Sequence, residues 1–437
     1  MDIAAIVKEL KDCPCGRLHE TDLKSAEIGH GLTEKTGEIL RSYNFPDNFL
    51  LVADKNTLAA SNGITDSLDR AGFCYKIKIY DDMRVADISD ARDICALSKP
   101  HSGILSVGTG SLNDICRHGI HLASLDGTPK KAFAIFATAP SMDGFASGTA
   151  PITENGFKET RPGVQPDVLI ADTAVLAASP AELKSAGFGD IMAKFTALAD
   201  WRVSALLTGE YYCEKIAALT RTALNKVVAL AGKVTENDEE TAGAIMEALI
   251  FTGVAMKLAD CVRPASGAEH MISHFWEMMK LKRGELSDFH GKKVSVATYH
   301  LCGVYHKLAD MEKIEAHPDV INKAELESVY GSALIGDIME RNSPAVTAAI
   351  TPESLEQNWS KIRLIVKEEV PPPDTMLRYM KAAGSATAPA EIAVDENLAD
   401  LGYKYHAYMR RRLTLSRLIP MLPAMSWGAG REDARLF

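Results

Sequence analysis

The sequence predicts an α/β domain over residues 1–180, followed by an all-α domain over residues 181–437. Short apolar runs alternate with helix-like segments in the first part, which is the pattern of a parallel sheet covered by helices. Long amphipathic segments without comparable apolar runs follow Pro180, and these are typical of a helical bundle. The length of 437 residues also favours two domains over one.

Five apolar runs in the first part have the length and composition of buried strands. They are Phe49–Asp54, Tyr75–Tyr80, Gly103–Gly108, Lys131–Thr138 and Asp167–Asp172. Near-continuous apolar runs suit strands that are buried on both faces. We therefore expect a doubly wound arrangement, in which a ligand binds beyond the carboxyl ends of the strands.

Five long amphipathic patterns in the second part predict helices. They cover Asp190–Thr208, Tyr211–Gly232, Glu239–Asp260, Gly267–Lys280 and His290–Leu308. Even the most apolar of these segments carries Glu247, and we find no stretch of the roughly 18 uncharged apolar residues that a membrane span requires. Charges also interrupt the N-terminus before a signal-peptide core forms, so we expect a cytoplasmic protein that does not enter a membrane.

The composition restricts the class of partner. A formal net charge of −10 disfavours nucleic acid, which requires clustered Lys and Arg against phosphate. A small anionic substrate in a local basic pocket is compatible with that charge. Most of the 8 cysteines are scattered singly, as in a chain whose thiols stay reduced.

One cysteine pair differs from the others. Cys13-Pro-Cys15 is followed by His19, and thiolates and imidazole are metal ligands. Two thiolates and one imidazole are nevertheless one ligand short of a structural zinc site. The local sequence therefore favours a segment without metal.

A glycine-rich turn, Gly108-Thr-Gly110-Ser-Leu112, separates a predicted strand from a predicted helix. Such a turn presents backbone N–H groups and a helix N-terminus to a phosphate. We expect Ser111 or Asn113 to cap the helix. The alternative is a plain strand-to-helix turn, which favours the same residue types.

Asp54 ends an earlier predicted strand. An acid at such a position can accept hydrogen bonds from both hydroxyls of an adenosine ribose. It would repel a 2′-phosphate, which favours NAD over NADP. The alternative is that Asp54 caps a helix that begins near Asn56.

Three potential metal ligands lie in unusual surroundings. Asp190 follows Gly187-Phe-Gly, where we expect an exposed turn before a long helix. His270 ends the motif that starts at Arg263, and His290 lies at the start of another predicted helix. One carboxylate and two imidazoles form a three-ligand site with open positions, which is the pattern of a catalytic metal. His274 lies one turn after His270 and faces the same way, so it is a further candidate.

Several distinctive motifs around these residues follow one another along the chain. They are Ala139–Ser147, Gly187–Lys194, Asp200-Trp201, Arg263–Glu277 and Phe289–Gly291. Together they closely resemble the sn-glycerol-1-phosphate dehydrogenase family, which belongs to the superfamily of iron-containing alcohol dehydrogenase, glycerol dehydrogenase and dehydroquinate synthase. The resemblance extends from about Phe49 to about Leu308 and more loosely to Arg412.

The resemblance implies a dehydroquinate synthase-like fold and roles for individual residues. The cofactor pyrophosphate would lie against Gly108, Thr109, Gly110, Ser111 and Leu112, with Thr109 standing where we expect glycine. Further cofactor contacts would come from Asp54, Thr138, Ala139, Pro140, Ser141 and Ser147, the last at the nicotinamide. The metal ligands would be Asp190, His270 and His290. The residues that contact substrate and take part in catalysis would be Asp143, Asp190 and His274.

The implied reaction is the reversible reduction of dihydroxyacetone phosphate to sn-glycerol 1-phosphate. The implied cofactors are NAD(H), with NADP(H) as the alternative, and one divalent ion of zinc, nickel or iron. We also expect a homo-oligomer. Two other activities of the superfamily stay open, a glycerol dehydrogenase without phosphate recognition and a sugar-phosphate cyclase. The cyclases carry Glu as the acidic metal ligand where this chain has Asp190.

Overall fold

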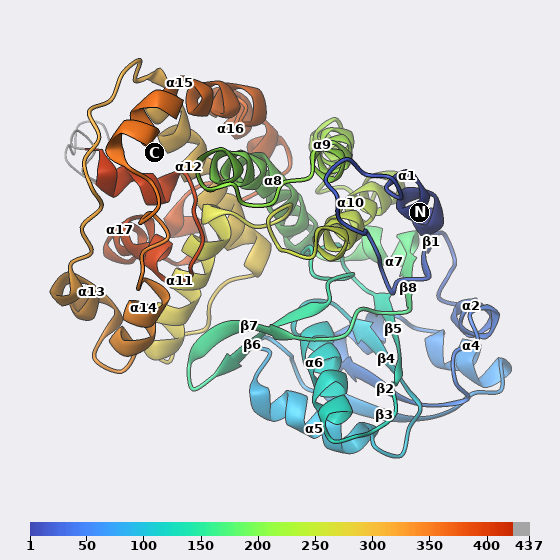
Figure 1. Cartoon of the computed structure of the whole chain (residues 1–437). Coiled ribbons are helices and arrows are strands. Elements are labelled where there is room, and N and C mark those ends of the chain that lie inside the picture. The colour runs from blue at the N-terminus through green and yellow to red at the C-terminus, as the bar shows by residue number, and fades with distance from the viewer. Residues whose placement is uncertain (423–437) are drawn as a thin grey trace.

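The computed structural model describes residues 1–422 and divides into a sheet-containing part and a helical part (Figure 1). Six parallel strands form the main sheet in the order β1-β8-β5-β4-β2-β3. Their bounds are β1 Ser25–Gly29, β2 Asn48–Asp54, β3 Cys74–Tyr80, β4 Gly103–Gly108, β5 Ala132–Ala137 and β8 Val168–Asp172. The five predicted strands are therefore confirmed, with bounds that differ by one residue at most.

Helices cover both faces of this sheet, as a doubly wound arrangement requires. The bounds of these helices are α2 Thr36–Ser42, α3 Lys55–Ala60, α4 Ile64–Arg70, α5 Ile88–Ser98, α6 Ser111–Leu125 and α7 Thr173–Ala178. Leu50 and Val52 of β2 pack in the core that contains α5 and α6. Phe49 and Leu51 point the other way, into a core with α2 and α4. Successive strand residues thus enter opposite cores.

Three strands were not expected, namely an edge strand of the main sheet and the two strands of a hairpin. The edge strand β1 has the sequence Ser-Ala-Glu-Ile-Gly, which is too short and polar to give an apolar run. The antiparallel hairpin of β6 (Thr149–Glu154) and β7 (Phe157–Pro162) lies outside the main sheet. Pro151 and Pro162 near the open end of the hairpin, together with several charged residues, hide the strand pattern in the sequence.

The chain after Pro180 is helical throughout its described part, and no described strand follows β8. The bounds are α8 Ala181–Thr208, α9 Glu214–Val228, α10 Glu239–Ala259, α11 Ala268–Lys282, α12 His290–Asp310, α13 Lys323–Tyr330, α14 Ile335–Arg341, α15 Pro352–Glu369, α16 Pro373–Ala382 and α17 Glu396–Tyr405. The predicted fold class is confirmed. The domain division at residue 180 stays a prediction, and residues 423–437 of its second domain lie outside the described residues.

Helix α10 is the most apolar of these helices. Its length and composition would allow it to cross a membrane, but 83% of its apolar window is buried inside the protein. Ile245, Leu249 and Val254 are fully buried. These contacts are those of a core helix in a globular protein.

The expectation of an exposed turn at Gly187-Phe-Gly-Asp190 was wrong. This segment lies inside α8, and all four residues are buried. A Cβ atom at Gly187 would overlap the carbonyl oxygen of Pro140, and one at Gly291 would overlap the carbonyl oxygen of Ala186. The glycines therefore permit close helix packing, and Asp190 lies within that packed region.

The close approach at Gly187 gives a stability prediction. Gly187→Ala adds a methyl group where no space exists, so we expect the free energy of unfolding to fall by about 1–3 kcal/mol, the usual cost of overpacking. Thermal denaturation measures the change. Gly232→Ala is the matched control, because a Cβ atom there meets nothing within 4 Å. Equal melting temperatures for the two variants would contradict the packing argument.

Candidate active site

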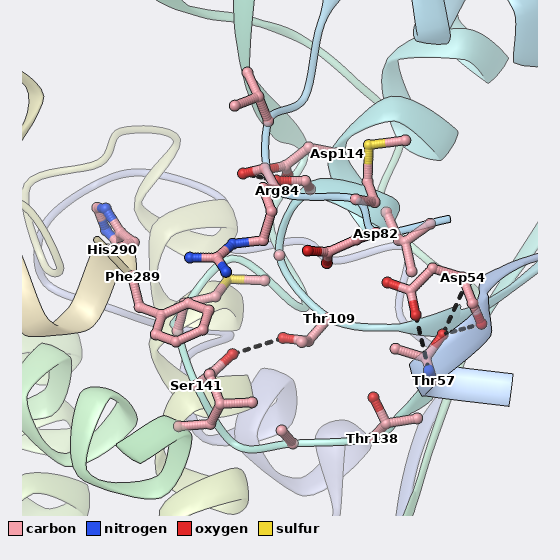
Figure 2. Close-up of a pocket in the computed structure, with 18 of the residues that line it drawn as sticks. Asp54, Thr57, Asp82, Arg84, Thr109, Asp114, Thr138, Ser141, Phe289 and His290 are labelled. Carbon is pink, nitrogen blue, oxygen red and sulfur yellow. Dashed lines mark hydrogen bonds between the residues drawn. The ribbon is translucent and has the colours of Figure 1, made fainter. Parts of the chain in front are cut away.

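A cavity of about 710 Å³ lies between the sheet and the helical part. It opens at the carboxyl ends of β2, β4 and β5, where Asp54, Thr109 and Thr138 line it (Figure 2). His274 of α11 and His290 of α12 line its other end. One cavity therefore extends from predicted cofactor residues to His290, the member of the predicted metal trio that lines it.

The glycine-rich turn leads from β4 into α6. Gly110 is the N-cap residue with a φ of +48°, and no side chain caps the helix. The expected cap was wrong, because Ser111 donates to the carbonyl oxygen of Arg84 at 3.2 Å and Asn113 accepts from Ser106 at 2.8 Å. The N-terminal end of α6 is thus left without a side-chain partner, as anion binding requires.

Thr109 has a partner of its own. Its hydroxyl lies 2.7 Å from the hydroxyl of Ser141, so the turn after β4 is tied to the turn after β5 (Figure 2). Thr138 and Ala139 line the same stretch of cavity. The threonine in place of the expected glycine therefore joins two segments that both border the cavity.

Asp54 caps a helix, which was one of its two predicted roles, and its contact with a ribose stays a prediction. Its Oδ1 accepts the N–H of Thr57 at 2.8 Å and caps α3, while the Thr57 hydroxyl oxygen accepts the Asp54 N–H at 3.0 Å. The same carboxylate lines the cavity, and Asp82 lines it nearby. Because one carboxylate oxygen suffices for the cap, the other is available to a ligand.

The predicted metal trio is brought together by three helices. Atoms of Asp190, His270 and His290 lie within 4.8 Å of one another, and Nε2 of His270 lies 3.4 Å from Oδ1 of Asp190. Asp190 is fully buried. Burial lowers the pKa of His290 to about 3, so its imidazole is neutral and able to coordinate a cation.

The neighbouring Glu269 fixes the orientation of His270. Nδ1 of His270 lies 2.9 Å from Oε1 of Glu269, a carboxylate that only accepts, so Nδ1 carries the proton. Nε2 is then directed at Asp190 and has no hydrogen-bond partner although it is buried. A carboxylate behind a metal-binding imidazole is the usual outer arrangement of a metal site. The unpartnered Nε2 therefore fits a metal ligand.

A buried lysine, absent from the sequence prediction, ties the trio to Asp143. Lys194 donates to Oδ2 of Asp143 and lies 3.4 Å from Oδ1 of Asp190. The Asp143 N–H donates to Oδ2 of Asp190 at 2.9 Å. Burial and the charge of Asp190 raise the pKa of Asp143, whereas Lys194 and the imidazoles hold the pKa of Asp190 below its usual value despite burial.

These charges favour a divalent cation. With His270 neutral, as a metal ligand must be, ionised Asp143, Asp190 and Glu269 carry three negative charges around the positive charge of Lys194, which leaves a net charge of minus two. All four side chains are buried, and buried charge without compensation is costly. A divalent ion among Asp190, His270 and His290 would neutralise the group.

A second group of charged residues was also missed by sequence reasoning. Lys158 of β7 lies 2.9 Å and Lys293 of α12 lies 3.1 Å from separate oxygens of Glu277. All three line the cavity beside His274, whose pKa burial lowers well below its usual value. The position of Lys293 one turn after His290 was the available signal, but Lys158 lies on the unexpected hairpin.

The remaining predicted residues occupy different positions. Ser111, Leu112 and Asp143 line the cavity. Gly108 and Pro140 do not line the cavity themselves, but residues next to them in the chain do. Ser147 is buried, and its carbonyl oxygen accepts from Arg117. The assigned roles of all these residues stay predictions.

Comparison with known proteins places these features in a family. Residues 27–180 match the family model described as iron-containing alcohol dehydrogenase. A glycerol-1-phosphate dehydrogenase [NAD(P)+] of Bacillus velezensis is 35% identical over 70% of this chain and 78% of its own. Another, from Geobacillus stearothermophilus, is 29% identical over 90% of this chain and 92% of its own.

A solved structure shares the fold. A probable glycerol dehydrogenase from Sinorhizobium meliloti superimposes with a TM-score of 0.58 at 16% identity, covering 92% of this chain and 93% of its own. At that identity the likeness concerns the fold alone.

The metal trio gives the prediction of this subsection. His290→Ala removes one of three ligands, so we expect the variant to lose most of the metal at this site and nearly all turnover while it stays folded. Elemental analysis and circular dichroism measure the two properties. The exposed His317→Ala is the matched control. A folded His290→Ala protein that keeps wild-type metal content would contradict the assignment.

Proposed function

Because the chain belongs to the glycerol-1-phosphate dehydrogenase family, we propose that it interconverts dihydroxyacetone phosphate and sn-glycerol 1-phosphate with NAD(H) or NADP(H) and a divalent metal ion. The observation that carries this proposal is one cavity with three groups along it. The uncapped N-terminus of α6 lies at one end. The Lys158–Glu277–Lys293 group and His290, through which the predicted metal trio reaches the cavity, lie at the other. These groups suit a dinucleotide, a ketone oxygen and a phosphate.

Asp190, His270 and His290 would hold the metal ion, and Glu269 and Lys194 would keep these ligands oriented. When bound there, the metal would supply Lewis-acid chemistry to a substrate oxygen, and the nicotinamide would supply the hydride. The trio does not distinguish zinc, nickel and iron, since all three accept imidazole and carboxylate ligands. The buried and unpartnered Nε2 of His270 supports this assignment.

Lys158 and Lys293 would bind the substrate phosphate. With Glu277 between them, the three residues leave one positive charge in a nearly buried corner of the cavity. Burial lowers the pKa of Lys293 to about 8, with Glu277 opposing the change, so this ammonium is still mostly protonated at neutral pH. A phosphate there gains charge-assisted hydrogen bonds. The pair favours a phosphorylated substrate over glycerol.

His274 and Asp143 would orient the rest of the substrate. The His274 ring centroid lies 5.5 Å from that of His290, and its imidazole is neutral because of burial. A neutral imidazole can donate a hydrogen bond to a substrate hydroxyl without adding charge. Asp143 lines the cavity and is held by Lys194, so its free carboxylate edge can accept a hydroxyl. Both residues would fix the ketone relative to the hydride donor.

The setting of the enzyme belongs to the same proposal. We place it in the cytoplasm, which suits eight free cysteines. We also infer a homo-oligomer. The outer strand β3 exposes Ile77 and Ile79, and an exposed strand edge of this kind supports self-association. The two domains would be residues 1–180 and 181–437, with the cavity between them.

The reaction itself can be tested with purified protein. We expect NADH or NADPH oxidation with dihydroxyacetone phosphate, little with unphosphorylated dihydroxyacetone, and loss of activity on chelation that added metal restores. Turnover of the two ketones with similar kcat/KM would contradict phosphate recognition and favour a glycerol dehydrogenase. Phosphate release without net oxidation of the cofactor would favour a cyclase.

The lysine pair leads to a specificity prediction. Lys158→Met removes one charge-assisted hydrogen bond, worth about 1.5–3 kcal/mol, so kcat/KM for dihydroxyacetone phosphate should fall roughly 10- to 150-fold. Most of the loss should appear in KM. Activity on unphosphorylated dihydroxyacetone should change little. The exposed Lys130→Met serves as control, and an equal loss on both ketones would argue against a phosphate contact.

Asp54 leads to a prediction about the cofactor. Its charge near the adenosine 2′ position should favour NADH over NADPH by about 1–3 kcal/mol. Asp54→Ser should narrow that gap and still cap α3, because serine accepts the same backbone N–H. The measurement is the ratio of kcat/KM for the two cofactors. The idea fails if the wild type uses NADPH as efficiently as NADH.

A further inference from the structure

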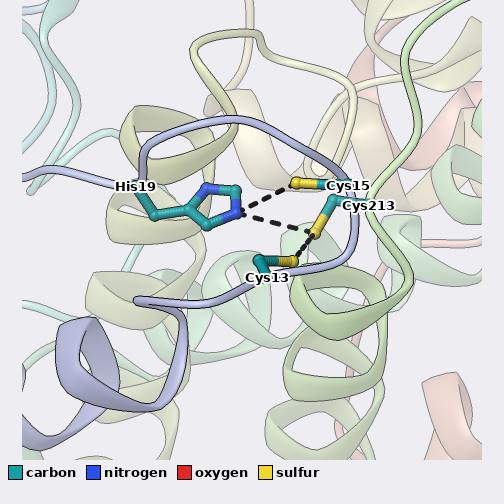
Figure 3. A group of neighbouring side chains, drawn as sticks. All are labelled: Cys13, Cys15, His19 and Cys213. Carbon is teal, nitrogen blue, oxygen red and sulfur yellow. Dashed lines mark hydrogen bonds between the residues drawn. The ribbon is translucent and has the colours of Figure 1, made fainter.

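A second cluster of metal-binding side chains lies far from the cavity, at the N-terminus. After α1 (Ile3–Glu9) the chain forms a loop that carries Cys13, Cys15 and His19. The loop lies against the helical part, where Cys213 immediately precedes α9 (Figure 3). Each of the four residues contributes one ligand atom, and these atoms lie within 4.8 Å of one another. The fold thus supplies the fourth ligand that the local sequence lacks.

The spacing of the four atoms fits a tetrahedral ion. Sγ of Cys13 lies 3.5 Å from Sγ of Cys213. Nε2 of His19 lies 3.2 Å from Sγ of Cys15 and 3.9 Å from Sγ of Cys213. Zinc bonds of about 2.3 Å to sulfur and about 2.0–2.1 Å to nitrogen require edges of about 3.8 Å and about 3.6 Å. The three edges given above differ from these values by about 0.4 Å or less, and all four ligand atoms lie within 4.8 Å of one another.

The second ring nitrogen of His19 supports a ligand role. Nδ1 lies 2.7 Å from the carbonyl oxygen of Leu258 in α10, and a carbonyl only accepts, so Nδ1 carries the proton. Nε2 then directs its lone pair into the group of sulfurs. His19 is also buried. A backbone carbonyl behind the imidazole is the outer contact that orients histidine ligands in metal sites.

Two other observations support the same conclusion. The hydroxyl of Tyr211 lies 3.6 Å from Sγ of Cys15 and can donate to a thiolate there. A disulfide explains the group less well, because all four cysteine and histidine side chains converge and the three cysteines are free thiols. A Cys13–Cys213 disulfide would not explain why the side chains of Cys15 and His19 also point to the same place.

We propose that Cys13, Cys15, His19 and Cys213 form a structural zinc site. Three thiolates and one imidazole fill a tetrahedral shell and leave no open position, which separates this site from a catalytic one. The ion would join the segment before β1 to the start of α9, about 200 residues later. It would thereby fasten the N-terminal segment to the helical part of the protein. This proposal does not depend on the proposed reaction.

Metal content and a spectroscopic signature test the site together. Wild-type protein purified without chelators should contain two metal ions per chain, and Cys213→Ser should contain one. The exposed Cys74→Ser is the matched control and should keep two. Cobalt-loaded wild type should show a thiolate-to-cobalt charge-transfer band in the near ultraviolet. That band should persist in His290→Ala, since the other site has no sulfur ligand, and vanish in Cys213→Ser.

Several results would overturn the proposal. They are a single metal per wild-type chain that His290→Ala abolishes, a charge-transfer band that survives in Cys213→Ser, and a Cys13–Cys213 disulfide in protein purified under reductant. Cys15→Ser is a second variant to use if Cys213→Ser does not fold. The cobalt spectrum of the wild type needs no variant, and absence of the thiolate charge-transfer band there would also contradict the proposal. Loss of the proposed reaction alone would leave this spectrum unchanged.

Discussion

The close packing of α8 against Pro140 and α12 is the constraint on which the site depends. Gly187 and Gly291 lack the Cβ atoms that would hold these segments apart. The resulting contact buries Asp190 completely and brings it within reach of His270 and His290. It also places Pro140 and the loop that carries Asp143 directly beside the predicted metal ligands, so the loop after β5 and the helices border the same candidate site.

Burial at this contact sets the electrostatics. Carboxylates taken out of water must be paired, and Lys194 pairs with Asp143 and Asp190 while His270 pairs with Glu269. The remaining negative charge suits a divalent ion. The lysine pair around Glu277 supplies the opposite sign a short distance along the same cavity. A substrate with a polarisable oxygen and a phosphate matches both groups, and this match links the fold to the proposed chemistry.

The sequence predicted those features that are encoded by residues adjacent to one another in the chain. Apolar runs identified five of the six strands in the main sheet, and unusual motifs singled out Asp190, His270 and His290, which the fold brings together. It was misleading at Gly187-Phe-Gly, because glycines serve turns and close helix contacts equally well. Lys158 and Cys213 could not be predicted as candidate ligands, because their partners Glu277 and Cys13 lie more than a hundred residues away and only the fold brings them together.

The configuration of the product tests the central claim most directly. If the metal trio fixes the ketone oxygen and Lys158 and Lys293 fix the phosphate, only one face of the ketone is open to hydride. The account predicts that dihydroxyacetone phosphate is reduced to sn-glycerol 1-phosphate, which an sn-glycerol-3-phosphate-specific dehydrogenase cannot oxidise. Complete oxidation of the product by that enzyme would contradict the account, even with the metal site confirmed.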